Sequence, residues 1–239
     1  MRDKKLGEAA NIFEKKVLSH FNKLDAACDI GTGNGNTTFA LARHFKSVFA
    51  IDIDELSLKK AEEKAREQKL TNIKFKLADA HHLPCLDSEF DVCCCRAAIH
   101  HFDDADSVLK EVHRILRPDG FFCLMDFCFS DYTSQILKPL SIIREDDFKR
   151  YYSFHGYCDL FEAGGFNIDC IYTYTLQRNV SEWISIAPKE IHERLNRAFL
   201  NIDNRVLKEL KVQEEADGQK TMIYRIVEIV GKKKKQIIM

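Results

Sequence analysis

The sequence predicts a doubly wound α/β fold, in which helices cover both faces of a mostly parallel sheet. Three observations predict it: strand-like and helix-like segments alternate, a glycine-rich turn follows the first strand, and acidic residues stand at the ends of successive strands. The chain has 239 residues, enough for one such domain with a complete hydrophobic core.

The alternation runs through the first half of the chain. Strands are expected at 24–30, 47–52, 73–78, 90–95 and 120–127, and helices at 36–45, 55–69 and 104–116. Such alternation builds βαβ units, so these strands should be parallel. An amphipathic helix is expected at 7–22, before the first strand, and two further strands at 167–176 and 221–230.

The turn after the first strand reads DIGTGNG over residues 29–35. Glycines let the backbone turn sharply and let a ligand lie against it. A dinucleotide-binding turn needs a third glycine at position 36, where Asn36 stands. The Asp29 carboxylate would repel a pyrophosphate but suits the cationic amino-acid end of S-adenosylmethionine. The expected contacts of this cofactor in the turn are Asp29, Gly31, Thr32, Gly33 and Gly35.

Two further acids follow later strands. Asp52 ends the strand 47–52, a position that accepts hydrogen bonds from ribose hydroxyls in doubly wound sheets. Ile53 would lie under the adenine, and Asp54 is expected to cap the next helix. Asp79 would accept from the adenine amine while the Ala80 N–H donates to the ring. Any one acid could be a loop residue, but three at successive strand ends indicate a ligand site.

With these residues, the chain resembles the class I S-adenosylmethionine-dependent methyltransferases, in the branch that includes the ubiquinone/menaquinone-type enzymes. The likeness is carried by residues 29–35, 50–54, 77–84, 90–103 (FDVCCCRAAIHHFD) and 109–126 (LKEVHRILRPDGFFCLMD). It implies a Rossmann-like, seven-stranded sheet with an antiparallel last strand, and methyl transfer to a small-molecule O-, N- or C-nucleophile. One departure is Asp119, where the family usually has glycine; aspartate tolerates that turn.

Candidate catalytic residues follow the strand 90–95, where the methyl group should sit. A general base is needed only if the nucleophile is a hydroxyl, a phenol or an acidic carbon. His100 and His101 are the candidates; since adjacent residues point different ways, at most one should serve and the other should be structural. Arg96 is an expected cofactor contact, and His81 and His82 lie in a neighbouring loop.

Two segments exceed the minimal sheet of this single domain, which spans 1–239. Residues 130–154 follow the fifth strand and residues 177–218 separate the last two strands. Ligands bind outside the carboxyl ends of the strands in such sheets, so these insertions are expected to form the substrate pocket, the second as a lid. It carries Trp183, the only tryptophan.

The composition of the chain limits the kinds of binding partner and the location that are expected. A net charge of −1 gives no reason to expect nucleic acid or an anionic membrane, and 232–235 is interpreted as a solvated lysine tail. The N-terminus lacks a signal peptide, and the longest apolar run, 121–129, is too short to span a bilayer, so a soluble cytoplasmic protein is expected. The nine cysteines are interpreted as core thiols with no disulfide framework and no metal. The oligomeric state is left open.

Three other classes of protein are alternatives for this sequence. A nicotinamide-dependent oxidoreductase is disfavoured by Asp29 and the missing third glycine. A nucleic-acid methyltransferase is disfavoured by the charge and by RAAI at 96–99, where an Asn/Asp-Pro-Pro-aromatic motif would be needed. A non-catalytic S-adenosylmethionine-binding module stays open.

Overall fold

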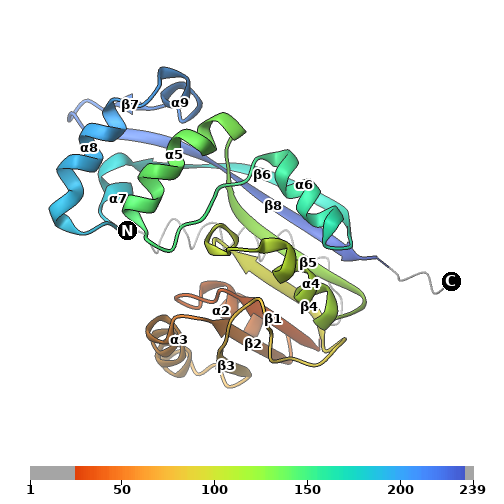
Figure 1. Ribbon diagram of the computed structural model, residues 1–239. Coiled ribbons are helices and arrows are strands. Elements are labelled where there is room, and N and C mark those ends of the chain that lie inside the picture. Colours follow the sequence, from red (N-terminus) through yellow and green to blue (C-terminus); the bar gives the residue numbers. More distant parts are fainter. Residues whose placement is uncertain (1–24, 235–239) are drawn as a thin grey trace.

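Eight strands form a single sheet in the computed structural model, which describes residues 25–234 (Figure 1). The strands are β1 (Ala26–Ile30), β2 (Ser47–Asp52), β3 (Ile73–Leu77), β4 (Phe90–Arg96), β5 (Leu116–Cys128), β6 (Phe166–Asn179), β7 (Gln213–Glu214) and β8 (Lys220–Lys233). Their order is β3-β2-β1-β4-β5-β8-β6, and the two-residue β7 pairs with β8.

The first five strands pair in parallel, whereas β8 is antiparallel to both β5 and β6. The predicted fold class is therefore confirmed, including the antiparallel last strand. The strand order reverses between β1 and β4, which lie side by side. Ligands bind at such a switch point, beyond the carboxyl ends of the strands.

Three helices lie at the predicted places: α2 (Asn36–Ala42), α3 (Glu55–Glu67) and α4 (Ala105–Ile115). The other helices of the described residues are η2 (Ile99–His101), α5 (Asp131–Arg144), α6 (Phe154–Ala163), α7 (Val180–Ile184), η3 (Lys189–Ile191), α8 (His192–Leu200) and α9 (Asn204–Glu209). Asp54 caps α3 as predicted, because its carboxylate accepts the Leu56 N–H at 3.0 Å. The helix expected at 7–22 lies outside the described residues.

Several predicted strand boundaries are wrong, because strand pairing extends the strands beyond the predicted ends. Strand β5 begins at Leu116 rather than at 120, because Leu116 already pairs with Phe90, and the turn with Asp119 at φ +64° becomes an irregularity in the register. β6 and β8 pair with each other along their length, which extends both beyond the predicted ends. Lys232 and Lys233 therefore belong to β8, not to a solvated tail.

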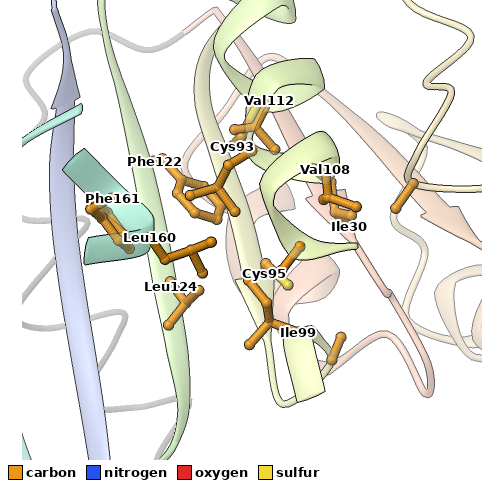
Figure 2. Packing of buried hydrophobic residues seen from close by; sticks show 14 of the residues in the cluster. Ile30, Cys93, Cys95, Ile99, Val108, Val112, Phe122, Leu124, Leu160 and Phe161 are labelled. Atoms are coloured by element: carbon orange, nitrogen blue, oxygen red, sulfur yellow. The ribbon is translucent and has the colours of Figure 1, made fainter. Parts of the chain in front are cut away.

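One hydrophobic core lies between the sheet and helices α4 and α6 (Figure 2). Apolar residues at helical spacing on α4 face β4 and β5, as its sequence pattern requires. Figure 2 shows them with their neighbours: Val108, Val112, Cys93, Cys95, Phe122, Leu124, Leu160 and Phe161. All nine cysteines are free thiols, and six of them are buried. Cys170 is only half-buried, because β6 is the edge of the sheet.

A second core joins the two insertions. Helix α5 of the first contacts α8 and α9 of the second, and all of them pack on β5 and β8. In Figure 1 these helices gather at one end of the sheet, together with α7. Buried members of this core include Leu137, Trp183, Phe199, Val206 and Met222. Within residues 25–234, no helix has both the length and the apolar character needed to cross a membrane.

Candidate active site

The glycine turn is held tightly against its neighbours at its first glycine. The N–H groups of Gly31 and Thr32 both donate to the Ile51 carbonyl, at 2.9 and 3.0 Å. Gly31 has φ +72°, and a Cβ on it would lie 2.4 Å from the Ala98 Cβ. Only glycine fits this position, for both conformational and steric reasons.

The Asp52 carboxylate anchors the next part of the turn. Its Oδ2 accepts the Gly33 N–H at 2.6 Å and its Oδ1 accepts the Asp54 N–H at 2.9 Å. A Cβ on Gly33 would meet nothing within 4 Å, so the turn is open on that side. Because a carboxylate has about four acceptor sites, Asp52 can still accept hydroxyl groups from a ligand.

A cavity of about 240 Å³ opens beside this turn. Six of the predicted site residues line it: Gly31, Asp52, Ile53, Asp79, Ala80 and His101. Ile53 is 72% exposed, which presents an uncovered apolar surface. No lysine or arginine of the described chain is among its walls. The cavity therefore suits an uncharged nucleoside better than a phosphate.

Asp79 organises the loop that closes this cavity. Its carboxylate accepts the backbone N–H of His81 at 2.9 Å and lies 2.6 Å from the His81 Nδ1. The backbone N–H first, and then the imidazole, lower the pKa of Asp79. The acid is thus ionised and fixed in place, ready to accept from an amine.

Asp29 and Arg96 form a separate polar cluster under helix α2. The Asp29 carboxylate is buried and accepts the Thr38 hydroxyl, while the Arg96 Nε donates to the Thr37 hydroxyl at 2.7 Å. Burial raises the pKa of Asp29 to about 6, against the effects of Thr38 and Arg96. Five predicted contacts do not line the 240 Å³ cavity: Asp29, Thr32, Gly33, Gly35 and Arg96.

His100 is locked to a buried carboxylate. Its Nδ1 lies 2.8 Å from both oxygens of Asp126, and the two residues are 3% and 2% exposed. Burial would lower the pKa of His100, but the charge and hydrogen bond of Asp126 outweigh it and raise that pKa. His100 therefore tends to carry a positive charge.

His101 has the opposite character. Burial, and then the neighbouring charge of His100, lower the pKa of His101, so its imidazole is neutral near pH 7. Its Nδ1 lies 3.2 Å from an Asp147 oxygen without hydrogen-bond geometry, and it has no hydrogen-bond partner within the described chain. The two rings stand 4.2 Å apart between centroids.

A second cavity, of about 90 Å³, lies on the other side of His101. His101 lines both cavities, and His100 lines only this second one. Ala97, Phe127 and Leu176 connect it to a smaller apolar recess of about 20 Å³. Ala97 has φ +50°, an uncommon value for alanine, at the point where β4 ends and the chain enters the site.

Several wall residues could not be predicted from the sequence. Asp147, in the 240 Å³ cavity, and Arg144 and Glu145, in the second cavity, come from the first insertion, and Arg178 comes from the end of β6. Phe102 and Asp103 directly follow the predicted histidines. Asp126 is recognisable in the sequence, because it is the single acidic residue in the apolar run 121–129.

One group of side chains in residues 25–234 has the spacing of metal ligands. One donor atom each from His100, His101 and Glu145 lie within 4.8 Å of one another. Glu145 already pairs with Arg144 and His100 with Asp126. The absence of a metal stays a prediction of the sequence.

Comparison with known proteins identifies the family. Residues 21–187 match the family described as a methyltransferase domain. The uncharacterized methyltransferase YcgJ of Bacillus subtilis is 28% identical over 158 residues, 65% of this chain and 62% of that protein. The demethylmenaquinone methyltransferase of Lactobacillus johnsonii is 36% identical over 120 residues, 48% of this chain and 47% of that protein. The chain thus matches less than two thirds of the length of either relative.

The fold comparison covers nearly the whole chain. The crystal structure of the Bacillus YcgJ protein aligns with a TM-score of 0.86 at 23% identity, over 95% of this chain and 99% of that chain. At this identity the likeness concerns the fold, and it agrees with the predicted Rossmann-like sheet. The family match covers more than half of the chain and confirms the resemblance drawn from its motifs. The chain belongs to the methyltransferase-domain family, in the class that depends on S-adenosylmethionine.

Proposed function

We propose that this protein transfers a methyl group from S-adenosylmethionine to a small-molecule acceptor held in the 90 Å³ cavity. The observation that carries the proposal is the position of His101, which lines both that cavity and the 240 Å³ cavity beside the glycine turn. Two cavities that share a wall at the switch point of the sheet allow a donor and an acceptor to meet there.

The walls of the larger cavity fit the parts of the cofactor. We assign Asp52 to the ribose hydroxyls, Ile53 to one face of the adenine, and Asp79 with the Ala80 N–H to the adenine edge. The glycine turn, with Gly31, Thr32, Gly33 and Gly35, is assigned to the amino-acid end. Asp29 and Arg96 would act beneath that end, on its ammonium and carboxylate groups.

The chemical demands on the protein are modest. Bound S-adenosylmethionine supplies an electrophilic methyl group whose leaving group is a neutral thioether. The protein must hold the acceptor in line with that methyl and exclude water, and orientation of this kind contributes roughly 7–11 kcal/mol to lowering a barrier. The walls of the 90 Å³ cavity, from η2, α5 and β6, are suited to holding the acceptor, and the proposed lid would help to exclude water.

We assign the general base, where the acceptor needs one, to His101 rather than to His100. A base must be unprotonated at working pH, and the pKa of His101 is lowered while that of His100 is raised. The Nδ1 of His101 is also free of hydrogen bonds to the rest of the described chain. His100, fixed by Asp126, would then position His101 and keep its pKa low.

The remaining assignments concern the acceptor and the chain as a whole. We propose a single methyltransferase domain over 1–239, with the insertions 130–154 and 177–218 forming the acceptor pocket and a lid. Nucleic acid is disfavoured as an acceptor by the net charge of −1. A cytoplasmic location stays a prediction of the sequence.

Calorimetry with S-adenosylhomocysteine and NAD tests the cofactor assignment. We expect binding of the first and none of the second. Asp52→Ala should weaken binding by about 1.5–3 kcal/mol, because it removes hydrogen bonds to a charged acceptor. Asp54→Ala is the matched control, since that residue caps α3 outside the cavity. Equal affinity for NAD, or full binding by Asp52→Ala, would refute the assignment. Release of S-adenosylhomocysteine with candidate acceptors distinguishes an enzyme from a binding module.

A further inference from the structure

Two arginine side chains are buried around the 90 Å³ cavity. Arg144 is 6% exposed and Arg178 is 9% exposed, and both line the cavity. A buried guanidinium loses most of its hydration and is tolerated only where anions or hydrogen-bond acceptors replace the water. The partners of these two guanidinium groups therefore indicate whether the cavity has room for an anionic ligand.

The described chain offers them a single carboxylate. The Arg144 Nη2 donates to Glu145 Oε2 at 2.9 Å, while its buried Nε has no hydrogen-bond partner in residues 25–234. The Arg178 guanidinium makes no hydrogen bond or ion pair with any other described residue, and its nitrogens, unlike the Arg144 Nε, are open to the cavity. The nearby positive charge of His100 is already matched by Asp126. The cavity wall thus carries one positive charge in excess.

A third unpaired donor lies in the same region. The Tyr224 hydroxyl is buried and has no hydrogen-bond partner within the described chain. Tyr224 pairs with Leu176 across β6 and β8, two positions from Arg178 on the same side of the strand. Burial and then Tyr151 raise the pKa of Tyr224, and the charges of Arg144 and Arg178 oppose them. Both guanidinium groups are therefore within electrostatic reach of the hydroxyl.

We propose that this cavity binds a carboxylate group of the methyl acceptor through Arg144 and Arg178. The planar guanidinium fork matches a carboxylate with two parallel hydrogen bonds. A single excess positive charge balances a monoanion better than a phosphate dianion. The adjoining apolar recess, with Phe127 and Leu176, would take a hydrocarbon part of the same molecule. The inference rests on the proposed function, because it names the acceptor class of that site.

The arrangement also explains how the nucleophile would be directed. The carboxylate would be held by groups from α5 and the end of β6, whereas His101, in η2, is the wall residue that this cavity shares with the 240 Å³ cavity. An acceptor anchored by its anionic end can thus present its nucleophilic end to His101. Specificity would come from the two arginines, since an uncharged analogue would leave the Arg178 guanidinium and the Arg144 Nε without an anionic partner.

Butanoate and butanamide are suitable probes, because they have nearly the same shape and differ in charge. The single tryptophan, Trp183, lies under the Arg144 guanidinium, 4.5 Å from its carbon to the ring centroid. Its fluorescence therefore reports directly on occupancy beside Arg144, and calorimetry provides a second readout. We expect wild-type protein with S-adenosylhomocysteine to bind butanoate at least about tenfold more tightly than butanamide, as for a charged group paired by hydrogen bonds.

Arg178→Gln should abolish this preference by weakening butanoate binding, whereas Arg178→Lys should retain part of it. Arg225→Gln is the matched control, because Arg225 lies on the neighbouring strand and its side chain is exposed. It should behave as wild type. Calorimetry with S-adenosylhomocysteine checks that each variant keeps its cofactor site.

The two proposals fail in different ways. Equal wild-type affinity for butanoate and butanamide by both readouts would overturn the carboxylate site, whatever happens to the variants. A butanoate preference that survives Arg178→Gln would also overturn it. Loss of cofactor binding by wild-type protein, with the butanoate preference intact, would instead refute the methyltransferase assignment and leave the anion site standing.

Discussion

The Nδ1 of His100 lies 2.8 Å from both carboxylate oxygens of Asp126, and neither residue is more than 3% exposed. Asp126 fixes the orientation of this imidazole and raises its pKa against the effect of burial. Burial, and then the neighbouring charge of His100, lower the pKa of the adjacent His101. The pKa values of the two neighbouring histidines are thus shifted in opposite directions.

Replacing His101 by Ala should slow methyl transfer by roughly 10²–10⁴-fold if the acceptor requires proton removal. Affinity for S-adenosylhomocysteine should change little, because His101 lines the same cavity but the assigned contacts are made by Asp52, Ile53, Asp79, Ala80 and the glycine turn. Single-turnover rates measure the effect. His82→Ala is the control, since His82 is exposed and lines neither cavity. A wild-type rate for His101→Ala would mean that catalysis rests on orientation alone.

The pH profile separates the two histidines. If His101 is the base, kcat/KM falls in acid with a midpoint below 6.5, the ordinary value for histidine, because its pKa is lowered. If His100 is the base, the midpoint lies above 6.5. A midpoint above 6.5 would therefore transfer the role to His100.

Asp126→Asn should destabilise the protein by about 3–5 kcal/mol, because it leaves a buried histidine without its anion. The pKa of His100 is higher in the folded protein than the ordinary value of 6.5. The ion pair of His100 with Asp126 therefore stabilises the fold fully below pH 6.5, and this stabilisation is lost as the pH rises through the folded-state pKa. Urea unfolding at several pH values measures the free energy of unfolding. The difference in this free energy between wild type and Asp126→Asn should become smaller at alkaline pH. A gap that widens with pH would contradict the assigned charge state.

Asp29→Asn should stabilise the protein without its cofactor and should lower its affinity for the cofactor. Burial raises the pKa of Asp29 from 3.8 to about 6, so wild-type stability falls as pH rises between these values. At neutral pH the ionised group costs roughly 1–3 kcal/mol, and Asn removes that cost while keeping an acceptor for Thr38. Urea unfolding and calorimetry at pH 7 measure the two effects. Asp25→Asn, just before β1, removes an exposed ion pair with Lys46 and should change either quantity only slightly, because such pairs contribute little.

The lid proposal predicts slower hydrogen exchange in residues 177–218 when S-adenosylhomocysteine and an acceptor are bound. This segment packs with α5 on the second core and contributes Arg178 and Ile186 to the 90 Å³ cavity. Helix α4, in the first core, is an internal control that should not respond. Unchanged exchange throughout 177–218 would leave these helices with a packing role only.

The walls of the 240 Å³ cavity, proposed as the cofactor site, could be predicted from the sequence because their positions follow from the order of the strands. Asp52 and Asp79 stand at the ends of parallel neighbouring strands, so their proximity is a consequence of the βαβ order. The acceptor side could not be predicted in this way. Arg144 and Arg178 are 34 positions apart, on different elements, and meet only because α5 and β6 pack around one cavity. Their burial, rather than any local pattern, identifies them.

The separate core of the insertions bears on how such a protein can evolve. The parallel strands pack with α4 and α6 in one cluster and with α2 and α3 in two others, whereas α5, α7, α8 and α9 share a cluster of their own. Selection can therefore exchange side chains in the insertions without disturbing the packing beneath the glycine turn. A library confined to 131–144 and 178–210 should yield new acceptor preferences at little cost to cofactor affinity. This makes the insertion layer the natural starting point for redesign.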